Sequence, residues 1–392
     1  MNVLSLFDGI SCGQLAFKRL GIAFGNERER ESNRYFASEV NKYAIQVTKK
    51  NFPNTIEIGD VRNVHYENGA LYKDCEYKSQ KWHLGEKVAD IVFDYLIGGS
   101  PCQNFSFAGK MNGMSTKTDE KITTLKRYLE LKDQNYEFDG YSYLFWEYIR
   151  LLNEVKPKYF LLENVRMKKE WRDVIDSVLG IEPIEINSAL VSAQSRKRLY
   201  WIGKKNNNIY NRINIQQPKD KGLIVKDILD YGNLKNEYVT YGVDKRYKQY
   251  FNKHNDIPQH FCAYSNCAVS TKTPTMTTHS GYGCGSGAIT NILPICLNSS
   301  GGLGANTGLY ATNEVPLYEV KNGMIKINDN TFPIKLPDGY YIIRKLSPLE
   351  CERLQTLDDN YTDCVSNNQR YKAIGNGWTV DVIKHILSYT LN

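Results

Sequence analysis

The hydrophobic pattern at the start of the chain predicts a strand, a turn and a helix in succession. Apolar residues dominate positions 3–7 and indicate a buried strand. Two glycines follow within positions 8–13, and positions 14–20 carry apolar side chains at helical spacing. Glycines let the backbone approach a ligand, and amides at a helix start can receive its polar groups, as in nucleotide-binding folds. A plain tight turn would show the same spacing, so this unit alone does not decide between the two.

Two further strands are predicted at positions 35–38 and 55–58, and each leads into an acidic residue. Glu39 ends the first of them, and Asp60 follows the second. In α/β sheets a carboxylate at the end of the second strand holds a ribose diol, and one after the third strand could accept a hydrogen bond from an adenine amino group. Each residue could equally be a helix cap or a surface charge. Because Asp8 also ends a strand, the repetition favours an adenosine-containing cofactor.

A fourth predicted strand, at positions 91–97, leads through two glycines to Pro101 and Cys102. Open α/β sheets place their chemistry at this edge. A cysteine between a stiffening proline and polar residues is placed like a nucleophile. A small buried thiol is the alternative, and this stretch alone supports both equally.

The following strands bring a carboxylate and two arginines to the same region. Positions 158–162 predict a buried strand that ends at Glu163, and two more strands follow. Arg196 and Arg198 lie between those two strands at alternating positions, so they share one face if the segment is extended. A solvated basic turn is the simpler interpretation of the arginines.

The polar stretches of the chain predict a lid and a second domain. Positions 103–141, directly after the cysteine, favour a mobile lid, although positions 121–131 could form a short helix. Positions 204–340 are rich in Asn, Thr, Gly, Lys and Tyr and predict a smaller, loop-rich β domain. Its hydroxyls, lysines and glycines, above all at positions 270–278 and 281–287, suit phosphate and base-edge contacts. An ordinary surface β domain would look similar.

Regular structure is predicted again near the carboxyl end of the chain. Ser347, Pro348 and Glu350 have the spacing of a helix cap, a first helical position and a capping box. A second glycine turn at positions 375–377 precedes a closing amphipathic helix at positions 379–387. This turn could complete the pocket that the first glycine turn begins.

Composition and charge limit the class of protein without identifying it. The chain has 392 residues, 41% of them hydrophobic, and can build a large domain with a smaller one. Its formal charge of +7 suits a polyanionic partner but also many other soluble proteins. The nine cysteines form no CxxC pair or zinc-type cluster, so we expect a reducing compartment and no structural metal. No signal peptide or membrane span is apparent, and a soluble cytoplasmic protein is expected.

The order of these motifs resembles the cytosine-C5 DNA methyltransferases, over about residues 1–203 and 344–392. The matching motifs are Phe7-Asp-Gly9, Gly99-Ser-Pro-Cys102-Gln, Glu163-Asn-Val165, Gln194-x-Arg196-x-Arg198, Arg344-x-Leu-Ser-Pro-x-Glu350-x-x-Arg353-Leu-Gln355 and Gly375-Asn376. The resemblance is to the bacterial and phage type. Two departures, Asp8 in the first motif and Gly377-Trp378 in the last, are similar to the branch containing the animal de novo methyltransferases.

The resemblance implies a Rossmann-like methyltransferase sheet that binds S-adenosylmethionine and releases S-adenosylhomocysteine. The catalytic domain would comprise residues 1–203, completed by residues 344–392, and residues 204–343 would form the target recognition domain. The implied cofactor-binding residues are Phe7, Asp8, Gly9, Ile10, Ser11, Cys12, Gly13, Glu39, Val40, Asp60, Val61, Ser100, Pro101, Leu144, Asn376, Gly377 and Trp378.

The family mechanism assigns catalytic roles to Cys102, Glu163, Arg196 and Arg198. By resemblance, the Cys102 thiolate adds to C6 of a cytosine flipped out of double-stranded DNA. Glu163 binds the N3 and amino edge and supplies a proton, so that negative charge does not build up on the ring. C5 then takes the methyl group, and loss of the C5 proton releases the cysteine. Arg198, with Arg196, lies near O2 of the base.

The resemblance is compatible with three functions, of which one is favoured by the sequence. We expect a monomeric DNA methyltransferase from a bacterial or phage-infected cell, with or without a cognate restriction endonuclease. A tRNA cytosine-5 methyltransferase is the closest rival, but the Cys-Phe-Thr tripeptide usual in that branch is absent. A non-catalytic DNA-binding regulator is disfavoured by the intact Cys102, Glu163 and Arg198. The target sequence cannot be inferred from the chain.

Overall fold

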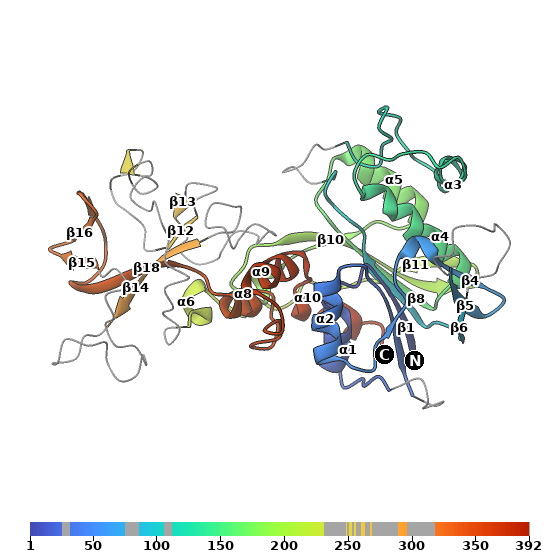
Figure 1. The fold of residues 1–392 in the computed structure, drawn as a ribbon, viewed down its shortest axis with the longest axis horizontal. Helices are drawn as coiled ribbons and strands as arrows, with labels where there is room; N and C mark the ends of the chain where they lie inside the picture. Colours follow the sequence, from blue (N-terminus) through green and yellow to red (C-terminus); the bar gives the residue numbers. More distant parts are fainter. Residues whose placement is uncertain are drawn as a thin grey trace. The chain divides into compact units, whose positions relative to one another are not determined.

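The computed structural model describes residues 1–25, 32–74, 86–105, 112–230, 248, 251–252, 255, 260–262, 267–268, 289–295 and 318–391 (Figure 1). These residues belong to two compact units. The first, here the sheet unit, comprises Met1–Asn187, Lys197–Pro218 and Val380–Asn392, and the second unit comprises Ser188–Arg196 and Lys219–Thr379.

The boundaries of the two units differ from the predicted domain boundaries at two places. Residues 204–212 continue the large sheet instead of opening the second domain. Residues 344–379 group with the second unit and not with the sheet. Only the last segment, Val380–Asn392, returns to the sheet unit.

The sheet unit is built on eight strands, of which seven follow the order β11-β10-β8-β7-β1-β2-β3, with β9 pairing with β10. Five neighbours, β8, β7, β1, β2 and β3, are parallel, and β10 is antiparallel to β8. The bounds are β1 Asn2–Leu6, β2 Arg34–Ser38, β3 Ile56–Glu57, β7 Tyr95–Gly99, β8 Tyr159–Val165, β9 Ile184–Asn187, β10 Lys197–Asn206 and β11 Ile209–Arg212. The predicted α/β class with a large parallel sheet is confirmed. Because β1 lies between β2 and β7, the strand order reverses there, which is where such sheets bind ligands.

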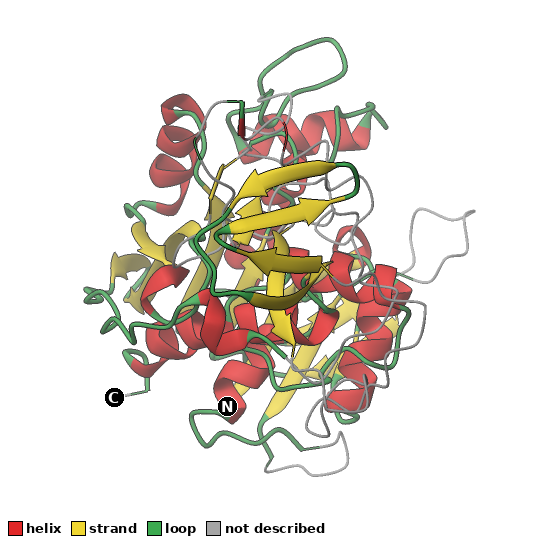
Figure 2. Ribbon diagram, turned by 90° about the vertical axis from the view of Figure 1, so that its left-hand side faces the viewer, coloured by secondary structure: helices red, strands yellow, loops and turns green. Residues whose placement is uncertain are grey.

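Helices (red in Figure 2) accompany the strands (yellow). The helices of the sheet unit are α1 Cys12–Lys18, α2 Lys42–Asn51, α3 Leu125–Asp133, α4 Phe145–Val155, α5 Lys169–Leu179 and α10 Val380–Ser388. The main core packs Trp146 and Leu151 of α4 and Trp171 of α5 against Leu4 and Leu96 of the sheet. Helix α10, the last of the chain, lies against α1, the first.

A small antiparallel sheet follows β3, and the sequence pattern did not predict it. Its strands are β4 Val64–Glu67, β5 Ala70–Lys73 and β6 Glu86–Asp90, in the order β4-β5-β6. Its residues Val64 and Leu71 are buried in the main core. Its alternating polar residues leave too short an apolar pattern to be recognised.

The prediction of a mobile lid is wrong for residues 112–141. This stretch contains helix α3, which Thr124 caps by accepting a hydrogen bond from the Arg127 amide. Four of its apolar side chains lie fully inside the core: Met114, Ile122, Tyr128 and Leu131. They are widely spaced among charged residues, so composition concealed them.

The second unit contains an antiparallel sheet in the order β13-β12-β14-β18-β15-β16-β17. Its strands are β12 His260–Cys262, β13 Cys267–Ala268, β14 Ile289–Ile295, β15 Tyr318–Lys321, β16 Met324–Ile327, β17 Asn330–Pro333 and β18 Gly339–Lys345. Its helices include α6 Val225–Ile228, α8 Pro348–Leu354 and α9 Asn367–Asn376. The expected β sheet is therefore present. The segments 270–278 and 281–287, predicted to contact DNA, lie outside the described residues.

The predicted start of α8 is confirmed. The Ser347 hydroxyl accepts from the Glu350 amide, and Glu350 accepts in return from the Ser347 amide. Glu350 also forms a buried ion pair with Arg344, the guanidinium Nη2 lying 2.6 Å from Oε1. This pair joins the end of β18 to the first turn of α8.

Candidate active site

The register of β7 and β8 brings the cysteine loop close to Glu163. Gly99, the last residue of β7, is paired with Glu163 of β8. The next residue, Ser100, is buried and is held to β8 because the Asn164 side-chain amide donates to its hydroxyl at 3.0 Å. Two residues further, Cys102 has a half-buried thiol that forms no disulfide. The chain places a thiol and a carboxylate at the carboxyl ends of neighbouring parallel strands.

Arg198 forms an ion pair with Glu163. It lies on β10, the strand antiparallel to β8, and its Nε is 3.1 Å from the Glu163 Oε1. The side chains are 13% and 12% exposed, respectively, so water screens the pair only partly. The Arg198 Nη1 also donates to the backbone carbonyl of Lys197 at 2.9 Å, which fixes the guanidinium. The structure thus brings together two of the predicted catalytic side chains.

Arg196 has different neighbours from Arg198. It belongs to the second unit, is 5% exposed, and its Nη2 donates to the carbonyls of Gly375 at 3.3 Å and Gly377 at 3.2 Å. These contacts hold the turn that ends α9. Its proposed place near the base stays a prediction, whereas its contacts identify it as a residue that positions this turn.

The last predicted pocket residues lie on the turn that Arg196 holds. Asn376 is exposed, Gly377 is buried and Trp378 is half-buried. The Gly377 amide donates to the Ala373 carbonyl and ends the helix. All three belong to the second unit, so their contribution to the cofactor pocket stays a prediction.

The first glycine turn is organised from inside the protein by Asp8. Its carboxylate accepts hydrogen bonds from the hydroxyls of Ser5, Tyr35 and Ser11. Burial raises the pKa of the Asp8 carboxyl above its ordinary value, although these hydrogen bonds oppose the rise. Asp8 therefore shapes the turn from inside the protein, and its place in the cofactor pocket stays a prediction.

The turn itself leaves open space over its backbone. Phe7 and Ser11 have φ values of 56° and 55°, and Gly9 has 61°, so three residues adopt the left-handed conformation. A Cβ built on Gly9 would have no atom within 4 Å. Ile10, Cys12 and Gly13 are buried behind the turn at the start of α1. The turn therefore leaves room above Gly9, while the amides of Asp8, Gly9 and Ser11 are hydrogen-bonded within the protein.

Glu39, directly after β2, is hydrogen-bonded to the glycine turn. Its Oε2 accepts from the Gly9 amide at 2.8 Å, and its Oε1 accepts from the amides of Val40 at 2.8 Å and Asn41 at 2.7 Å. The Val40 side chain is 68% exposed, which is unusual for a large apolar residue beside a buried strand. A carboxylate next to an exposed apolar side chain and an open glycine fits the ribose and base of an adenosine.

Asp60 lies at the turn after β3. It accepts from the amide of Arg62 at 2.9 Å and from the Arg62 guanidinium Nε at 3.0 Å. Burial alone would raise the pKa of the Asp60 carboxyl, but these hydrogen bonds and the charge of Arg62 outweigh it and lower the pKa. Asp60 is therefore an anionic acceptor at this edge of the sheet.

The other predicted pocket residues lie on elements around the same edge. Val61 is buried in the short 3-10 helix Val61–Asn63, and Leu144 is half-buried directly before α4. Pro101 is half-buried in the cysteine loop. Ser100 is instead engaged with Asn164, as described above.

Sequence reasoning missed Glu57, on β3 beside Ala37. Among the described residues, neither of its carboxylate oxygens has a hydrogen-bond partner, although both are buried. Burial, followed by the negative charge of Asp8, raises the pKa of Glu57 to about 7, against the opposing effect of Lys49. The Ile-Glu-Ile alternation at 56–58 contained the signal, because it places a charge inside a strand.

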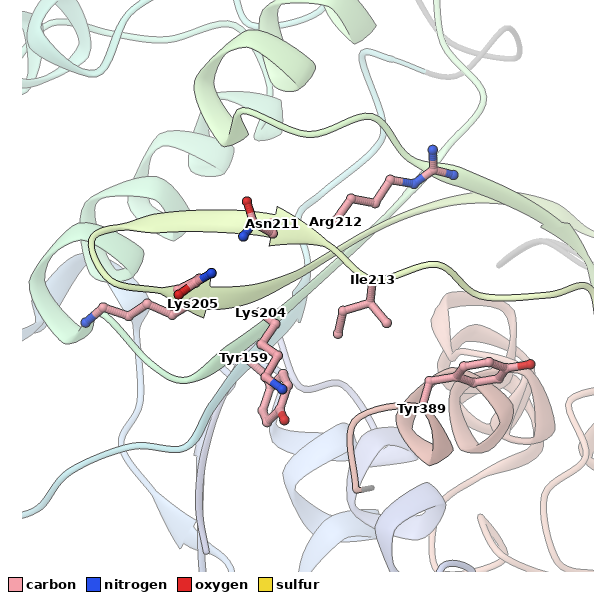
Figure 3. A pocket seen from close by; sticks show the side chains of 8 residues that line it. Tyr159, Lys204, Lys205, Asn211, Arg212, Ile213 and Tyr389 are labelled. Carbon is pink, nitrogen blue, oxygen red and sulfur yellow. The ribbon is translucent and has the colours of Figure 1, made fainter.

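A separate hollow of about 490 Å³ lies at another part of the sheet unit (Figure 3). Tyr159 and Lys204, which line it, are paired at the amino end of β8. Glu163 lies near the opposite end of that strand. The hollow is therefore separate from the candidate active site.

In the part of the chain that the structure describes, no three His, Cys, Asp or Glu side chains are grouped so as to hold a metal ion. No described helix is long and apolar enough to cross a membrane.

Comparison with known proteins gave a consistent family. The model for the C-5 cytosine-specific DNA methylase family matches residues 1–174 and 187–391. The chain is 25% identical to the orphan methyltransferase M.SPRI of Bacillus phage SPR, covering 98% of this chain and 96% of that protein. It is 24% identical to the type II methyltransferase M.Bsp6I of a Bacillus species, covering 98% and 97%.

Two solved structures share the fold at lower identity. The Entamoeba histolytica methyltransferase EhMeth superimposes with a TM-score of 0.53 at 16% identity, covering 99% of this chain and 97% of that one. The Dnmt2 methyltransferase of S. pombe gives 0.55 at 14% identity, covering 100% and 98%. At these identities the likeness concerns the fold alone.

Proposed function

The chain belongs to the C-5 cytosine-specific DNA methylase family, and from this membership we propose that it methylates C5 of a cytosine in double-stranded DNA with S-adenosylmethionine as methyl donor. The observation that carries the site assignment is the Glu163–Arg198 ion pair, in register with the strand that leads into Cys102. A nucleophile and a hydrogen-bonding carboxylate on one sheet edge are what addition to a pyrimidine ring requires.

The proposed mechanism begins with a covalent bond to the base. The Cys102 thiolate adds to C6 of a flipped cytosine, which makes C5 nucleophilic. Glu163 hydrogen-bonds N3 and shares a proton with it, so the ring electrons move to C5 without a full charge on the ring. After C5 is methylated, its proton passes to water, the C6–sulfur bond breaks and the N3 proton returns to Glu163, which restores the neutral aromatic ring and the thiolate.

Arg198 keeps the Glu163 carboxylate in one orientation through the 3.1 Å contact of Nε with Oε1. A guanidinium presents planar donors, and its Nη atoms can also approach the base oxygen. The bound cofactor would supply an electrophilic methyl group. The open side of Gly9, the Glu39 carboxylate and the exposed Val40 would hold its adenosine part. Carboxylate oxygens have several lone pairs, so Glu39 can accept from ribose hydroxyls while it keeps its backbone contacts.

The test is the variant Cys102→Ser. We expect loss of tritium transfer from labelled S-adenosylmethionine to DNA with unchanged cofactor binding, because the change removes the thiolate and leaves the glycine turn intact. The matched control is Cys364→Ser, another half-buried cysteine, which should methylate normally. Full activity of Cys102→Ser would overturn the assignment.

The family supports DNA as the substrate, and the names of the relatives indicate the class of enzyme. They are called orphan and type II methyltransferases, and we infer the same class for this chain, with a cognate endonuclease as the open alternative. Bisulfite sequencing of DNA and RNA from a host that expresses the protein measures both substrates in one experiment. Methylation restricted to tRNA would replace the DNA proposal.

A further inference from the structure

Residues 112–144, here called the insert, contact two separate parts of the proposed active site. Its first and last residues contact the loop that carries Cys102, and helix α3, in its middle, contacts the turn after β3 that carries Asp60. We propose that the insert is a strut that positions both, with Asn104 and Lys132 as the positioning residues at these two contacts. The inference rests on the proposed function, because it assigns the two contacts to the nucleophile and to the adenine side of the cofactor pocket.

At the first contact, Asn104 holds the cysteine loop against both ends of the insert. Its amide donates to the Ser142 hydroxyl at 3.1 Å, and its side-chain Nδ2 donates to the Asp139 carbonyl at 2.8 Å. The Asn104 carbonyl accepts from the Gly113 amide at 2.9 Å. All three partners belong to the insert, and Asn104 is only 7% exposed. The residue two positions after Cys102 is therefore held on three sides by one segment.

The fit between Asn104 and the insert is close. Gly140 has a φ of +63°, and a Cβ on it would lie 2.7 Å from the Asn104 Nδ2. Only glycine combines that backbone conformation with that approach. The cysteine loop thus rests against a surface shaped for it.

At the second contact, Lys132 of α3, in the middle of the insert, pairs with a buried carboxylate on α4. Its Nζ lies 2.6 Å from Oε1 of Glu147, which is fully buried and also accepts from the Tyr128 hydroxyl. The other oxygen of Glu147 accepts from the Arg150 Nε at 2.7 Å. A buried carboxylate needs such partners, since an unpaired charge in the interior is strongly unfavourable.

Arg150 connects Glu147 to the backbone of the turn after β3, on the predicted cofactor side of the site. Its Nη2 donates to the carbonyls of Val61 at 3.2 Å and Val64 at 2.7 Å. Lys132 also lies 3.4 Å from the Arg62 carbonyl. The 3-10 helix that Asp60 caps is therefore anchored to α4 and α3 through its backbone. Changes in α3 should move this turn without touching the cysteine loop.

The two contacts predict different kinetic effects. Loss of the Asn104 side chain should lower kcat, because small displacements of a nucleophile slow attack strongly. Loss of the Lys132 ammonium should weaken cofactor binding and raise KM for S-adenosylmethionine, because the Asp60 turn shifts while Cys102 does not.

The experiment measures equilibrium binding of S-adenosylhomocysteine by calorimetry together with methylation kinetics. For Lys132→Met we expect about tenfold weaker binding with kcat unchanged, the loss of one charge-assisted contact being of that order. Lys132→Arg should restore binding because it keeps the cation. Lys126→Met, an exposed lysine on the same helix, is the matched control and should bind as the wild type does.

For Asn104→Ala we expect about tenfold lower kcat, again the order of one hydrogen bond, with unchanged binding of S-adenosylhomocysteine. Asn104→Ser, which keeps a small polar side chain, serves if the alanine variant does not fold. The strut is overturned if the variants leave both quantities at wild-type values or if both variants change the same quantity. A wild-type protein that neither binds S-adenosylhomocysteine nor methylates DNA would instead overturn the proposed function, and this inference with it.

Discussion

Replacing Arg198 with methionine tests the ion pair at the centre of the proposed site. The Arg198 Nε and Glu163 Oε1 are 3.1 Å apart, and the side chains are 13% and 12% exposed. At an effective dielectric constant of about 20, unit charges at that separation attract by about 5 kcal/mol. Desolvation offsets part of this, and deleting one partner of a mostly buried pair costs about 3–5 kcal/mol. Because this pair keeps some contact with water, we expect a cost of about 3 kcal/mol, at the lower end of that range, when the Arg198 guanidinium is removed.

If the transition state loses this stabilisation of about 3 kcal/mol, kcat/KM decreases by about two orders of magnitude, since 1.36 kcal/mol corresponds to a factor of ten. The assay is single-turnover tritium transfer to DNA, with binding of S-adenosylhomocysteine measured in parallel. Arg198→Lys should recover part of the rate, because an ammonium keeps the charge but not the planar Nε donor.

The matched control for Arg198→Met is Lys197→Met, an exposed cation at the neighbouring position of β10, whose side chain points to the opposite face of the strand. This variant should methylate at the wild-type rate. Equal rates for Arg198→Met and the wild type would refute the reasoning, and so would an equal loss in Lys197→Met. A loss of cofactor binding in Arg198→Met would show that the change acts on the fold of the pocket.

Two further predictions concern stability. The pKa of Glu57 is raised to about 7 from 4.5, so the folded protein disfavours its ionised form, and the stability present below pH 4.5 is lost as the pH rises to about 7. Glu57→Gln should therefore be more stable than the wild type in urea unfolding at pH 8 and not at pH 4.5, whereas the exposed control Glu67→Gln should show no such difference; an equal change at both pH values would contradict the assignment. Gly98→Ala should lower the free energy of unfolding by about 1–3 kcal/mol, because its Cβ would lie 2.8 Å from the Leu6 carbonyl and 3.2 Å from the Tyr148 ring. If urea unfolding of Gly98→Ala matched the wild type, β7 and β1 would have to move apart at this position without loss of stability, which would contradict the prediction.

Much of the candidate site was predictable because it depends on order along the chain. Cys102, Glu163 and Glu39 each follow an apolar strand, and parallel strands bring such ends to one edge of a sheet. The register that pairs Gly99 with Glu163 and the contact between Glu163 and Arg198 agree with this expectation. The role of Asp8 was harder to predict, since sequence position cannot show that its carboxylate faces three hydroxyls of the protein.

The insert shows the limit of prediction from composition. Its charged residues suggested a lid, yet Lys132 compensates a fully buried Glu147 and Asn104 is enclosed by Ser142 and Asp139. Such contacts join residues that are 15 to 38 positions apart. No periodic pattern records them.

The sequence by itself determined the strands of the large parallel sheet, the α/β class, the family and the chemistry of the strand ends, because hydrophobic periodicity and motif order are local properties. Only the tertiary structure decided how the strands are ordered, that Arg198 pairs with Glu163 while Arg196 holds the turn at Gly375 and Gly377, and that the insert packs into the core. The physical reason is that a charge or a polar side chain takes its role from its burial and its partners, and both depend on residues far away along the chain.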